Sequence, residues 1–521
     1  METIHAPTDQ YHQLRHGTAA GAGHSVQHLS AKQFMVLAEA LRRAAQAHPE
    51  KIAFVHAHQR LSYAQWLNCI DRVAGGLLAR GLQPGDRLAF YAASSTNYVL
   101  TLWACFRTGI IAVPLNSHHL ASELQPVLRH IEPAALFTDK AHAAKLQSIT
   151  LPKIIIRDEE KFFSELLTAT PYVGPDPPPD ALALILYTSG TTGQPKGVAH
   201  RQASITSHLF ALHRLWQLST DDVVLHALPL HHVHGLLISM ASALLAGSTL
   251  LFHSRFDAAT TLNTLYEQKV TAFMGVPTMY YRLLQQPGPS RFPHMRLFVC
   301  GSAPLPQPLA QAFFERFGLP LLERAGMTET LMIFANKYGE PPVAGSVGKP
   351  LPGVQVRLID DSGRNVDVGS IGEIWIKSPY MFKEYWKNHQ ATADAFCNGW
   401  FRTGDMGRCD QNGNYFIVGR KKEIIKSGGI LIFPSEIESV LLQMPGVADC
   451  AVVGIPDAEF GERIKACVVV TKPLTAEDII QYCRQHLASY KKPAVVAFYD
   501  VLPRNAMGKI DRAALKNQRG P

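Results

Sequence analysis

The first half of the chain alternates segments of helical spacing with short apolar runs. Apolar residues recur at helical spacing over residues 34–47 and 97–108, whereas the runs at 87–92 and 110–115 have the length of strands. Further strand-length runs occupy residues 181–186, 223–228, 249–252, 272–276 and 297–300. This alternation predicts parallel sheets covered by helices. The stretch PYVGPDPPPD at residues 171–180 continues neither kind of element and predicts an irregular loop.

The rest of the chain changes character twice. Short strands separated by glycines follow residue 345 and indicate a β subdomain, and after residue 419 two helices alternate with three strands in an α+β pattern. Because 521 residues exceed what one core normally organises, two or more cores are expected. We predict an α/β fold with a large N-terminal domain of layered sheets and helices and a small α+β C-terminal domain. The expected parts are a disordered segment (1–30), the large domain (31–419) and the small domain (420–521).

Charge and cysteine content exclude several classes of function. The net charge of +8 is spread along the chain, and the longest basic runs, 420–422 and 491–492, are too short for a nucleic-acid surface. The eight cysteines lie far apart without zinc-ligand spacing, which favours a reducing compartment, the cytoplasm. Residues 235–252 are uncharged but contain two glycines, three serines and a threonine, so we interpret them as a buried helix and a strand rather than a membrane span.

The strongest chemical signal is the run YTSGTTGQPKG at residues 187–197, directly after a predicted strand. Its glycines let backbone N–H groups face an anion, its hydroxyls add donors, and Lys196 adds positive charge. No Ser or Thr follows Lys196, so this is not the Walker spacing. The run therefore predicts a different kind of phosphate-binding loop, whose contributing residues are Thr188, Ser189, Gly190, Thr191, Thr192, Gly193 and Lys196.

Six further motifs follow in order along the chain. They are LPLHHVHG at 228–235, GSAP at 301–304, ERAGMTET at 323–330, GWFRTGD at 399–405, GRKKEIIKSGG at 419–429 and PRNAMGK at 503–509. With the phosphate loop, this series resembles the adenylate-forming superfamily of acyl-CoA synthetases, luciferases and peptide-synthetase adenylation domains, and several stretches look closest to malonyl-CoA synthetases. The resemblance implies an ATP-dependent acid:CoA ligase that uses ATP, Mg²⁺ and coenzyme A, and a small domain that rotates between two half-reactions.

The resemblance also assigns roles to individual residues. It implies catalytic roles for Thr328 at the phosphate, for Glu329 as the magnesium ligand, for Lys509 at the α-phosphate and for His232 as a gate between the acyl and thiol routes. It places Lys422 at the hinge between the domains. The residues implied in binding the nucleotide or coenzyme A, besides the phosphate loop, are Ser302, Ala303, Pro304, Glu323, Arg324, Ala325, Gly326, Met327, Asp405, Arg420 and Gly429.

The sequence alone does not decide which acid is activated or which thiol accepts the acyl group. Malonate needs a positive partner for its second carboxylate, and Arg255, with help from His234, is one candidate beside a pocket that includes Gly275. An uncharged short or medium-chain acid is the alternative. A second class of function is the loading of a separate carrier protein. A third is a catalytically weakened nucleotide-binding homologue, suggested by Ala325, which stands where the family usually has an aromatic residue against adenine.

Overall fold

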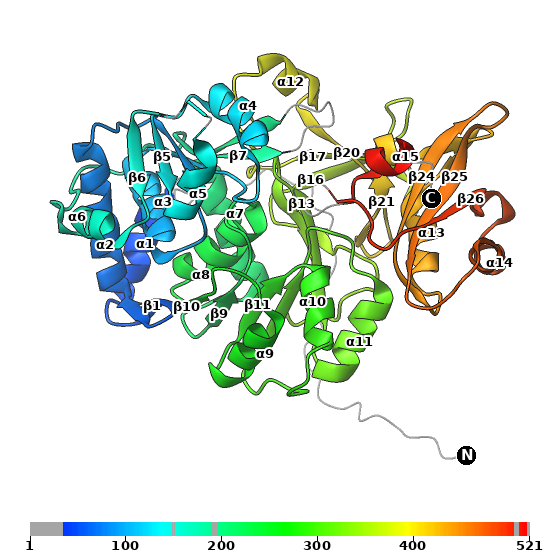
Figure 1. The fold of residues 1–521 in the computed structure, drawn as a ribbon, viewed down its shortest axis with the longest axis horizontal. Helices are drawn as coiled ribbons and strands as arrows, with labels where there is room; N and C mark the ends of the chain where they lie inside the picture. The colour runs from blue at the N-terminus through cyan, green and yellow to red at the C-terminus, as the bar shows by residue number, and fades with distance from the viewer. Residues whose placement is uncertain (1–34, 148, 151, 189–194, 505–509, 518–521) are drawn as a thin grey trace, which may run out of the picture. The chain divides into compact units, whose positions relative to one another are not determined.

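The computed structural model describes residues 35–147, 149–150, 152–188, 195–504 and 510–517. Within these ranges the backbone forms four sheets with helices packed against them (Figure 1), which confirms the predicted α/β fold. The predicted disordered segment, residues 1–30, lies outside the described residues. Every helix in the described ranges is too short or too polar to cross a lipid bilayer.

A seven-stranded sheet carries the phosphate-loop motif. Its order is β18–β8–β7–β4–β3–β5–β6, parallel from β7 to β6, with β8 antiparallel to both β7 and β18. Parallel neighbours need crossover connections, which explains the alternation of helices and strands in the sequence. The strands are β3 (Arg87–Tyr91), β4 (Ile111–Pro114), β5 (Ala135–Thr138), β6 (Ile154–Arg157), β7 (Leu182–Thr188), β8 (Lys196–Arg201) and β18 (Glu384–Tyr385). The helices of this region are α2 (Tyr63–Ala79), α3 (Thr96–Thr108), α4 (Ala121–Ile131), α5 (Lys140–Ala143), the 3₁₀ turn η2 (Ala144–Leu146) and α6 (Glu160–Thr168).

A nine-stranded sheet holds the motifs between residues 228 and 330. Its order is β15–β14–β13–β12–β11–β9–β10–β1–β2, with parallel pairing from β1 through β13 and antiparallel strands at both edges. The strands are β1 (Ile52–His56), β2 (Gln59–Ser62), β9 (Val223–His226), β10 (Thr249–Phe252), β11 (Ala272–Gly275), β12 (Leu297–Cys300), β13 (Leu321–Met327), β14 (Leu331–Ala335) and β15 (Lys349–Pro350). The associated helices are α1 (Leu37–Ala47), α7 (Gln202–Trp216), the π-helical segment η3 (His234–Ala241), α8 (Ser242–Leu245), α9 (Ala258–Glu267), α10 (Pro277–Leu284) and α11 (Gln307–Phe317).

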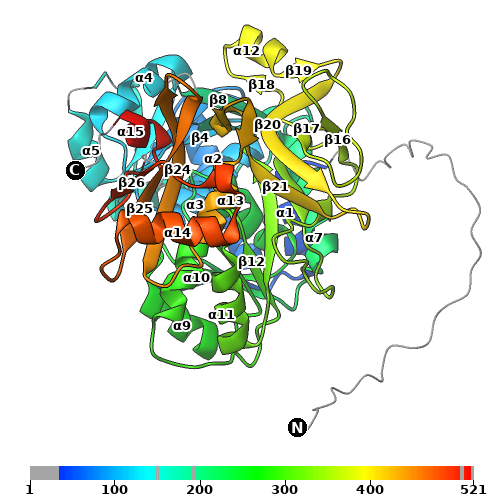
Figure 2. The same cartoon turned by 90° about the vertical axis from the view of Figure 1, so that its right-hand side faces the viewer.

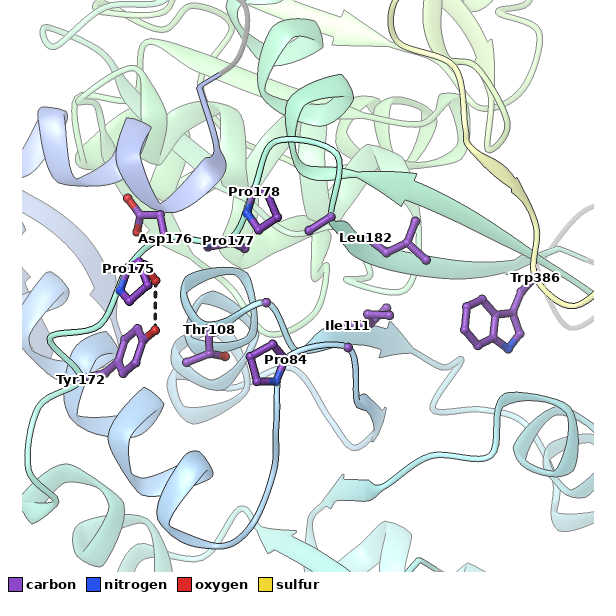
Figure 3. A pocket seen from close by; sticks show the side chains of 13 residues that line it. Pro84, Thr108, Ile111, Tyr172, Pro175, Asp176, Pro177, Pro178, Leu182 and Trp386 are labelled. Carbon is purple, nitrogen blue, oxygen red and sulfur yellow. Dashed lines mark hydrogen bonds between the residues drawn. The ribbon is translucent and has the colours of Figure 1, made fainter.

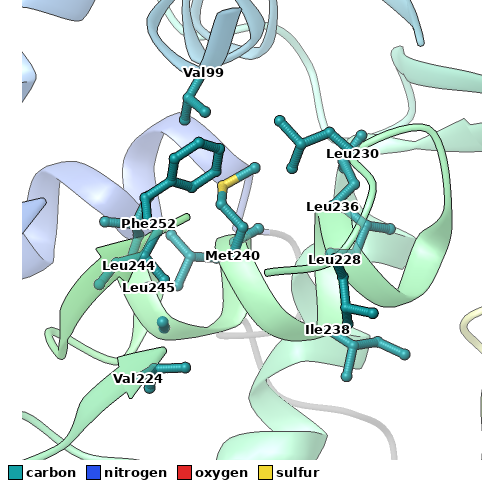
Figure 4. Close-up of a cluster of buried hydrophobic side chains, with 14 of the residues drawn as sticks. Val99, Val224, Leu228, Leu230, Leu236, Ile238, Met240, Leu244, Leu245 and Phe252 are labelled. Atoms are coloured by element: carbon teal, nitrogen blue, oxygen red, sulfur yellow. The ribbon is translucent and has the colours of Figure 1, made fainter. Parts of the chain in front are cut away.

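Helices fill the space between these two sheets and share one core with both. Helix α3 is buried on nearly every side, which is the pattern of a helix enclosed by other layers. Figure 4 shows Val99 of α3 facing Phe252 of β10 and Met240 of η3. The sequence predicted a buried helix followed by a strand at 235–252, and the structure confirms both, but the helix begins with π-helical turns. Gly235 lets the preceding loop approach the start of this helix closely, because a Cβ there would lie 2.2 Å from the carbonyl oxygen of Pro229.

Two smaller sheets follow in the chain. The first, the predicted β subdomain, is antiparallel and consists of β16 (Gln355–Ile359), β17 (Gly372–Lys377), β19 (Phe396–Cys397), β20 (Trp400–Cys409) and β21 (Tyr415–Arg420), with α12 (His389–Asp394) beside it. The second consists of β22 (Ile425–Ser427), β23 (Ile430–Ile432), β24 (Val447–Asp457), β25 (Gly461–Val470) and β26 (Val495–Phe498). Helices α13 (Pro434–Leu441) and α14 (Ala476–His486) pack on one face of this last sheet, as Figure 2 shows, and α15 (Arg512–Asn517) packs on the other. The remaining short turns are η4 (Lys421–Glu423) and η5 (Ser489–Lys491).

The proline-rich stretch at 171–180 is an irregular segment, as predicted, and a buried arginine fixes it. The guanidinium of Arg107 donates to Asp71 at 3.0 Å and to Asp176 at 2.9 Å. Its remaining nitrogen donates to the carbonyl oxygen of Gly174 at 3.0 Å. The same segment lines a cavity of about 480 Å³ that extends to Trp386 (Figure 3) and contains none of the predicted site residues.

Replacing Arg107 with methionine is expected to destabilise the protein strongly. Removing one partner from a buried ion pair leaves an uncompensated charge, here on Asp71, and such changes lower the free energy of unfolding by about 3 kcal/mol or more. Arg43→Met is the matched control, because Arg43 is exposed and its ion pair with Glu39, one helical turn away, lies at the surface. Urea denaturation followed by circular dichroism measures both variants. Equal midpoints for the two would contradict the role assigned to Arg107.

Candidate active site

The predicted phosphate loop connects two paired strands. Thr188 ends β7, Lys196 begins β8, and the two residues face each other in the antiparallel ladder. The loop residues Ser189, Gly190, Thr191, Thr192 and Gly193 lie outside the described part of the chain. The ammonium of Lys196 lies 4.9 Å from the centre of the Tyr385 ring, in cation–π geometry. Lys196 is therefore positioned beside the loop by contacts within the sheet.

The Thr328–Glu329 turn joins β13 to β14 and is tied to the seven-stranded sheet. His200 of β8 donates its Nε2–H to the Thr328 carbonyl oxygen at 2.7 Å. Burial lowers the pKa of His200 to about 4, so the ring is neutral and has one N–H to give. The Tyr385 hydroxyl donates to Oε1 of Glu329 at 2.9 Å, and both side chains are buried. Two segments that sequence reasoning did not connect thus hold this turn in place.

Just before the turn, the backbones of β13 and β14 approach each other closely at Gly326. The ladder between β13 and β14 shifts register between Ala325 and Gly326. A Cβ on Gly326 would lie 2.0 Å from the carbonyl oxygen of Leu331, so the bulge requires glycine. Ala325 is half-buried against the core that contains Phe334, and Met327 packs against the same core.

The GSAP motif forms a strained loop after β12. Ser302 has a φ of +72°, a left-handed conformation that is uncommon outside glycine, and Ser302, Ala303 and Pro304 are all exposed. Glu323 of β13 closes the loop by accepting a hydrogen bond from the Leu305 N–H at 3.2 Å. Burial raises the pKa of Glu323 to about 7. This hydrogen bond holds the loop against β13. It thereby brings together the GSAP motif and the ERAGMTET motif, two of the predicted nucleotide-binding motifs.

Arg324 is a buried cation without a carboxylate partner among the described residues. Its side chain is 6% exposed, and one terminal nitrogen donates to the Ser302 hydroxyl at 3.3 Å. Its Nε has no hydrogen-bond partner in the described part of the chain. Burial lowers its pKa to about 10, which still leaves it protonated at neutral pH. Burying a charge without a counter-charge is unfavourable, so we expect an anion to bind beside Arg324.

The predicted pocket residues divide into two groups. His234 is fully buried, its Nδ1 lies 3.3 Å from the Ser302 hydroxyl, and burial together with the Arg324 charge holds its pKa well below the usual range. Gly275 ends β11 beside Tyr280 and accepts from the Gly301 N–H through its carbonyl at 3.3 Å. Arg255, in contrast, is solvent-exposed between β10 and α9 and forms no ion pair or hydrogen bond with other described residues. The structure therefore brings His234 and Ser302 to Arg324, but not Arg255.

The three clustered histidines do not form a metal site with their neighbours. His231 and His232 pack ring to ring with centroids 4.2 Å apart. Burial and the charge of His232 lower the pKa of His231 to about 2. In the described ranges, no group of three or more His, Cys, Asp or Glu side chains has the arrangement of a metal site.

The predicted ribose and hinge residues lie around the end of the β subdomain. Asp405 of β20 and Arg420 of β21 face each other in the ladder and form an ion pair at 2.6 Å. Lys422 lies in the short turn η4, where burial lowers its pKa. Gly429 has a φ of +80° in the turn between β22 and β23, with open space where a Cβ would be. Lys509, the predicted mobile lysine, lies outside the described residues.

Comparisons with known proteins identify relatives over most of the chain. Residues 41–386 match the model of the AMP-binding enzyme family, and residues 436–509 match that of the AMP-binding enzyme C-terminal domain. An indoleacetate–CoA ligase of Aromatoleum aromaticum is 35% identical over 91% of this chain and 96% of its own. A malonate–CoA ligase of Arabidopsis thaliana is 35% identical over 84% of this chain and 78% of its own. The structure of an O-succinylbenzoate coenzyme A synthetase of Bacillus subtilis with ATP and magnesium ion superposes with a TM-score of 0.82 at 32% identity, covering 92% of this chain and 98% of that one.

A Cβ at Gly326 is expected to disrupt the turn that carries Thr328 and Glu329. The clash of Gly326→Ala is with backbone, so the hairpin must shift, at a stability loss of about 1–3 kcal/mol and with weaker binding of ATP and Mg²⁺. Gly339→Ala is the control, because Gly339 also lies in a turn but a Cβ there meets nothing. Its positive φ alone is expected to reduce stability by about 1 kcal/mol. Isothermal titration with ATP and Mg²⁺ compares the two, and equal affinities would refute the effect assigned to Gly326.

Proposed function

The chain belongs to the AMP-binding enzyme family and is an AMP-forming acyl-CoA synthetase, and we propose that its substrate is malonate or another short to medium-chain carboxylic acid. The carboxylate oxygen attacks the α-phosphorus of ATP and pyrophosphate leaves, which gives an acyl-adenylate. The thiolate of coenzyme A then attacks the acyl carbon, AMP leaves, and the thiol proton passes to solvent. The thioester and AMP are the products.

The chemistry explains why these residue types are needed. A carboxylate is a poor electrophile because its oxygen is a poor leaving group, so AMP is attached first. Lys196 and the loop after β7 supply positive charge and donors for the phosphates, which stabilise charge that develops at the α-phosphate. Asp405, oriented by Arg420, accepts hydrogen bonds from the ribose hydroxyls. Magnesium, when bound, offsets phosphate charge, and the carboxylate of Glu329 is a hard oxygen ligand that fits it.

The observation that supports a second negative charge on the acid is the buried guanidinium of Arg324, which forms no ion pair with a carboxylate in the described part of the chain and whose Nε has no hydrogen-bond partner there. Arg324 contacts Ser302 and lies beside His234, two residues predicted at the nucleotide and at the acyl pocket. A carboxylate at the far end of a short acid would supply the negative charge that this guanidinium lacks among the described residues. In malonate a single methylene group separates this second carboxylate from the one that reacts. Since the relatives include ligases for malonate and for indoleacetate, the charge on the far end of the acid is what the experiment must test.

Coenzyme A is the proposed acceptor rather than a carrier protein, because the relatives reported above are CoA ligases by name. All eight cysteines are free thiols, which supports the cytoplasm as the proposed compartment. We also propose that the domains at 31–419 and 420–521 rotate about Lys422 between the two half-reactions.

A comparison of four acids tests the proposed role of Arg324 in binding the second carboxylate. Pyrophosphate release is measured with malonate, succinate, butyrate and indoleacetate for the wild type, Arg324→Met and the exposed control Arg255→Met. Losing a charge-assisted contact worth about 1.5–3 kcal/mol predicts at least a tenfold rise in KM for malonate in Arg324→Met. Butyrate is expected to change little. Thermal unfolding of each variant shows whether it remains folded. A parallel loss for butyrate and malonate would remove Arg324 from acid recognition.

Lys509 is expected to serve the first half-reaction alone. Lys509→Ala should abolish formation of the acyl-adenylate, because the charge at the α-phosphate is missing, while transfer from synthetic acyl-adenylate to coenzyme A persists. Lys516→Ala is the control, since Lys516 is a half-exposed lysine of α15. Single-turnover assays of each half-reaction make the measurement. Equal loss in both steps would contradict the proposed role.

A further inference from the structure

Tyr385 stands between two charged residues of the candidate site. It belongs to β18, a two-residue strand paired with β8. Hydrogen bonds on either side, from the Lys383 N–H to Ala199 and from the Trp386 N–H to Gly197, both at 2.7 Å, fix the segment against β8. The Tyr385 N–H also donates to the Thr392 hydroxyl at 3.0 Å. Backbone pairing therefore fixes the segment, and packing in the core beside Phe382 fixes the ring.

The hydroxyl of Tyr385 orients the carboxylate of Glu329. It donates to Oε1 at 2.9 Å, and the described residues make no other hydrogen bond to this carboxylate. Because a carboxylate oxygen only accepts, the phenolic hydroxyl is the donor of this pair. One carboxylate oxygen is thus held by the protein, while the second has no protein donor in the described part of the chain.

The face of the same ring contacts Lys196. Its ammonium lies 4.9 Å from the ring centre, while Lys196 and Glu329 form no ion pair with each other. Two opposite charges in direct contact would neutralise each other, and each would be less available to a ligand. The tyrosine ring gives the lysine a partner that is weaker than a carboxylate and easily exchanged for a phosphate.

We propose that Tyr385 is a positioning residue that holds Glu329 for the magnesium ion and Lys196 for the phosphates of ATP, and that keeps these two charges from pairing. This inference rests on the proposed function. Tyr385 itself touches neither the acid nor the reacting phosphorus.

Two substitutions distinguish the contribution of the Tyr385 hydroxyl from that of its ring. Tyr385→Phe removes the bond to Glu329 and keeps the face over Lys196, whereas Tyr385→Leu removes both. Tyr380→Phe is the matched control, because Tyr380 is equally buried in the same segment but donates to the backbone of Pro352. Calorimetry measures the affinity for ATP in Mg²⁺ and in EDTA, and thermal unfolding checks that each variant is folded.

We expect Tyr385→Phe to lower the affinity for ATP about tenfold in Mg²⁺, as for a lost hydrogen bond to a charged group, and not in EDTA. Tyr385→Leu should lower it under both conditions. If Tyr385→Phe matches Tyr380→Phe in Mg²⁺, the positioning role is refuted while the proposed function stands. If the wild type binds ATP but never forms AMP with any acid and coenzyme A, the proposed function fails instead.

Discussion

Strand β8 pairs with β7 on one side and with β18 on the other, and this antiparallel ladder joins segments almost two hundred residues apart. The phosphate-loop motif, the lysine that follows it and the tyrosine of β18 all depend on it. His200, on the same strand, reaches across to the backbone of the Thr328–Glu329 turn. Backbone hydrogen bonds within a sheet are directional and numerous, so they fix positions more tightly than isolated side-chain contacts do.

Burial determines which groups around this ladder carry charge. The pKa of His208 falls to about 3 and that of His234 falls well below its usual range, because imidazolium is poorly solvated in the interior. These rings act as neutral donors and acceptors across the physiological pH range. Arg324 is just as buried but keeps its proton, since an arginine starts from a far higher pKa. The positive charge in this part of the site is therefore permanent and does not depend on a histidine titration.

Much of the architecture was predictable because it follows from local pattern. The strand expected at 87–92 is β3, the helix expected at 97–108 is α3, and the loop expected at 171–180 is irregular. Motif order also singled out Thr328 and Glu329, although the hairpin of β13 and β14 that carries them was not predicted. Tyr385 and His200 were not predictable, because their roles come from pairing between distant strands and neither lies in a recognisable motif. Arg324 was assigned to the nucleotide from its motif, but only the structure shows that its guanidinium is buried beside Ser302 and His234 without a carboxylate partner among the described residues.

The π-helical segment at His234–Ala241 affects how a deletion in this part of the chain would change the surroundings of His234. A π-turn holds one more residue than an α-turn, so a single-codon deletion in η3 would restore regular α geometry. Each residue along a helix turns by about 100°, so the side chains on one side of the deletion would rotate by that angle relative to the rest. With the deletion just after His234, the rest of the segment would turn relative to His234 and its contact with Ser302. One genetic event would thus change which side chains of this segment lie beside His234, without altering the strands that carry the candidate nucleotide-binding motifs.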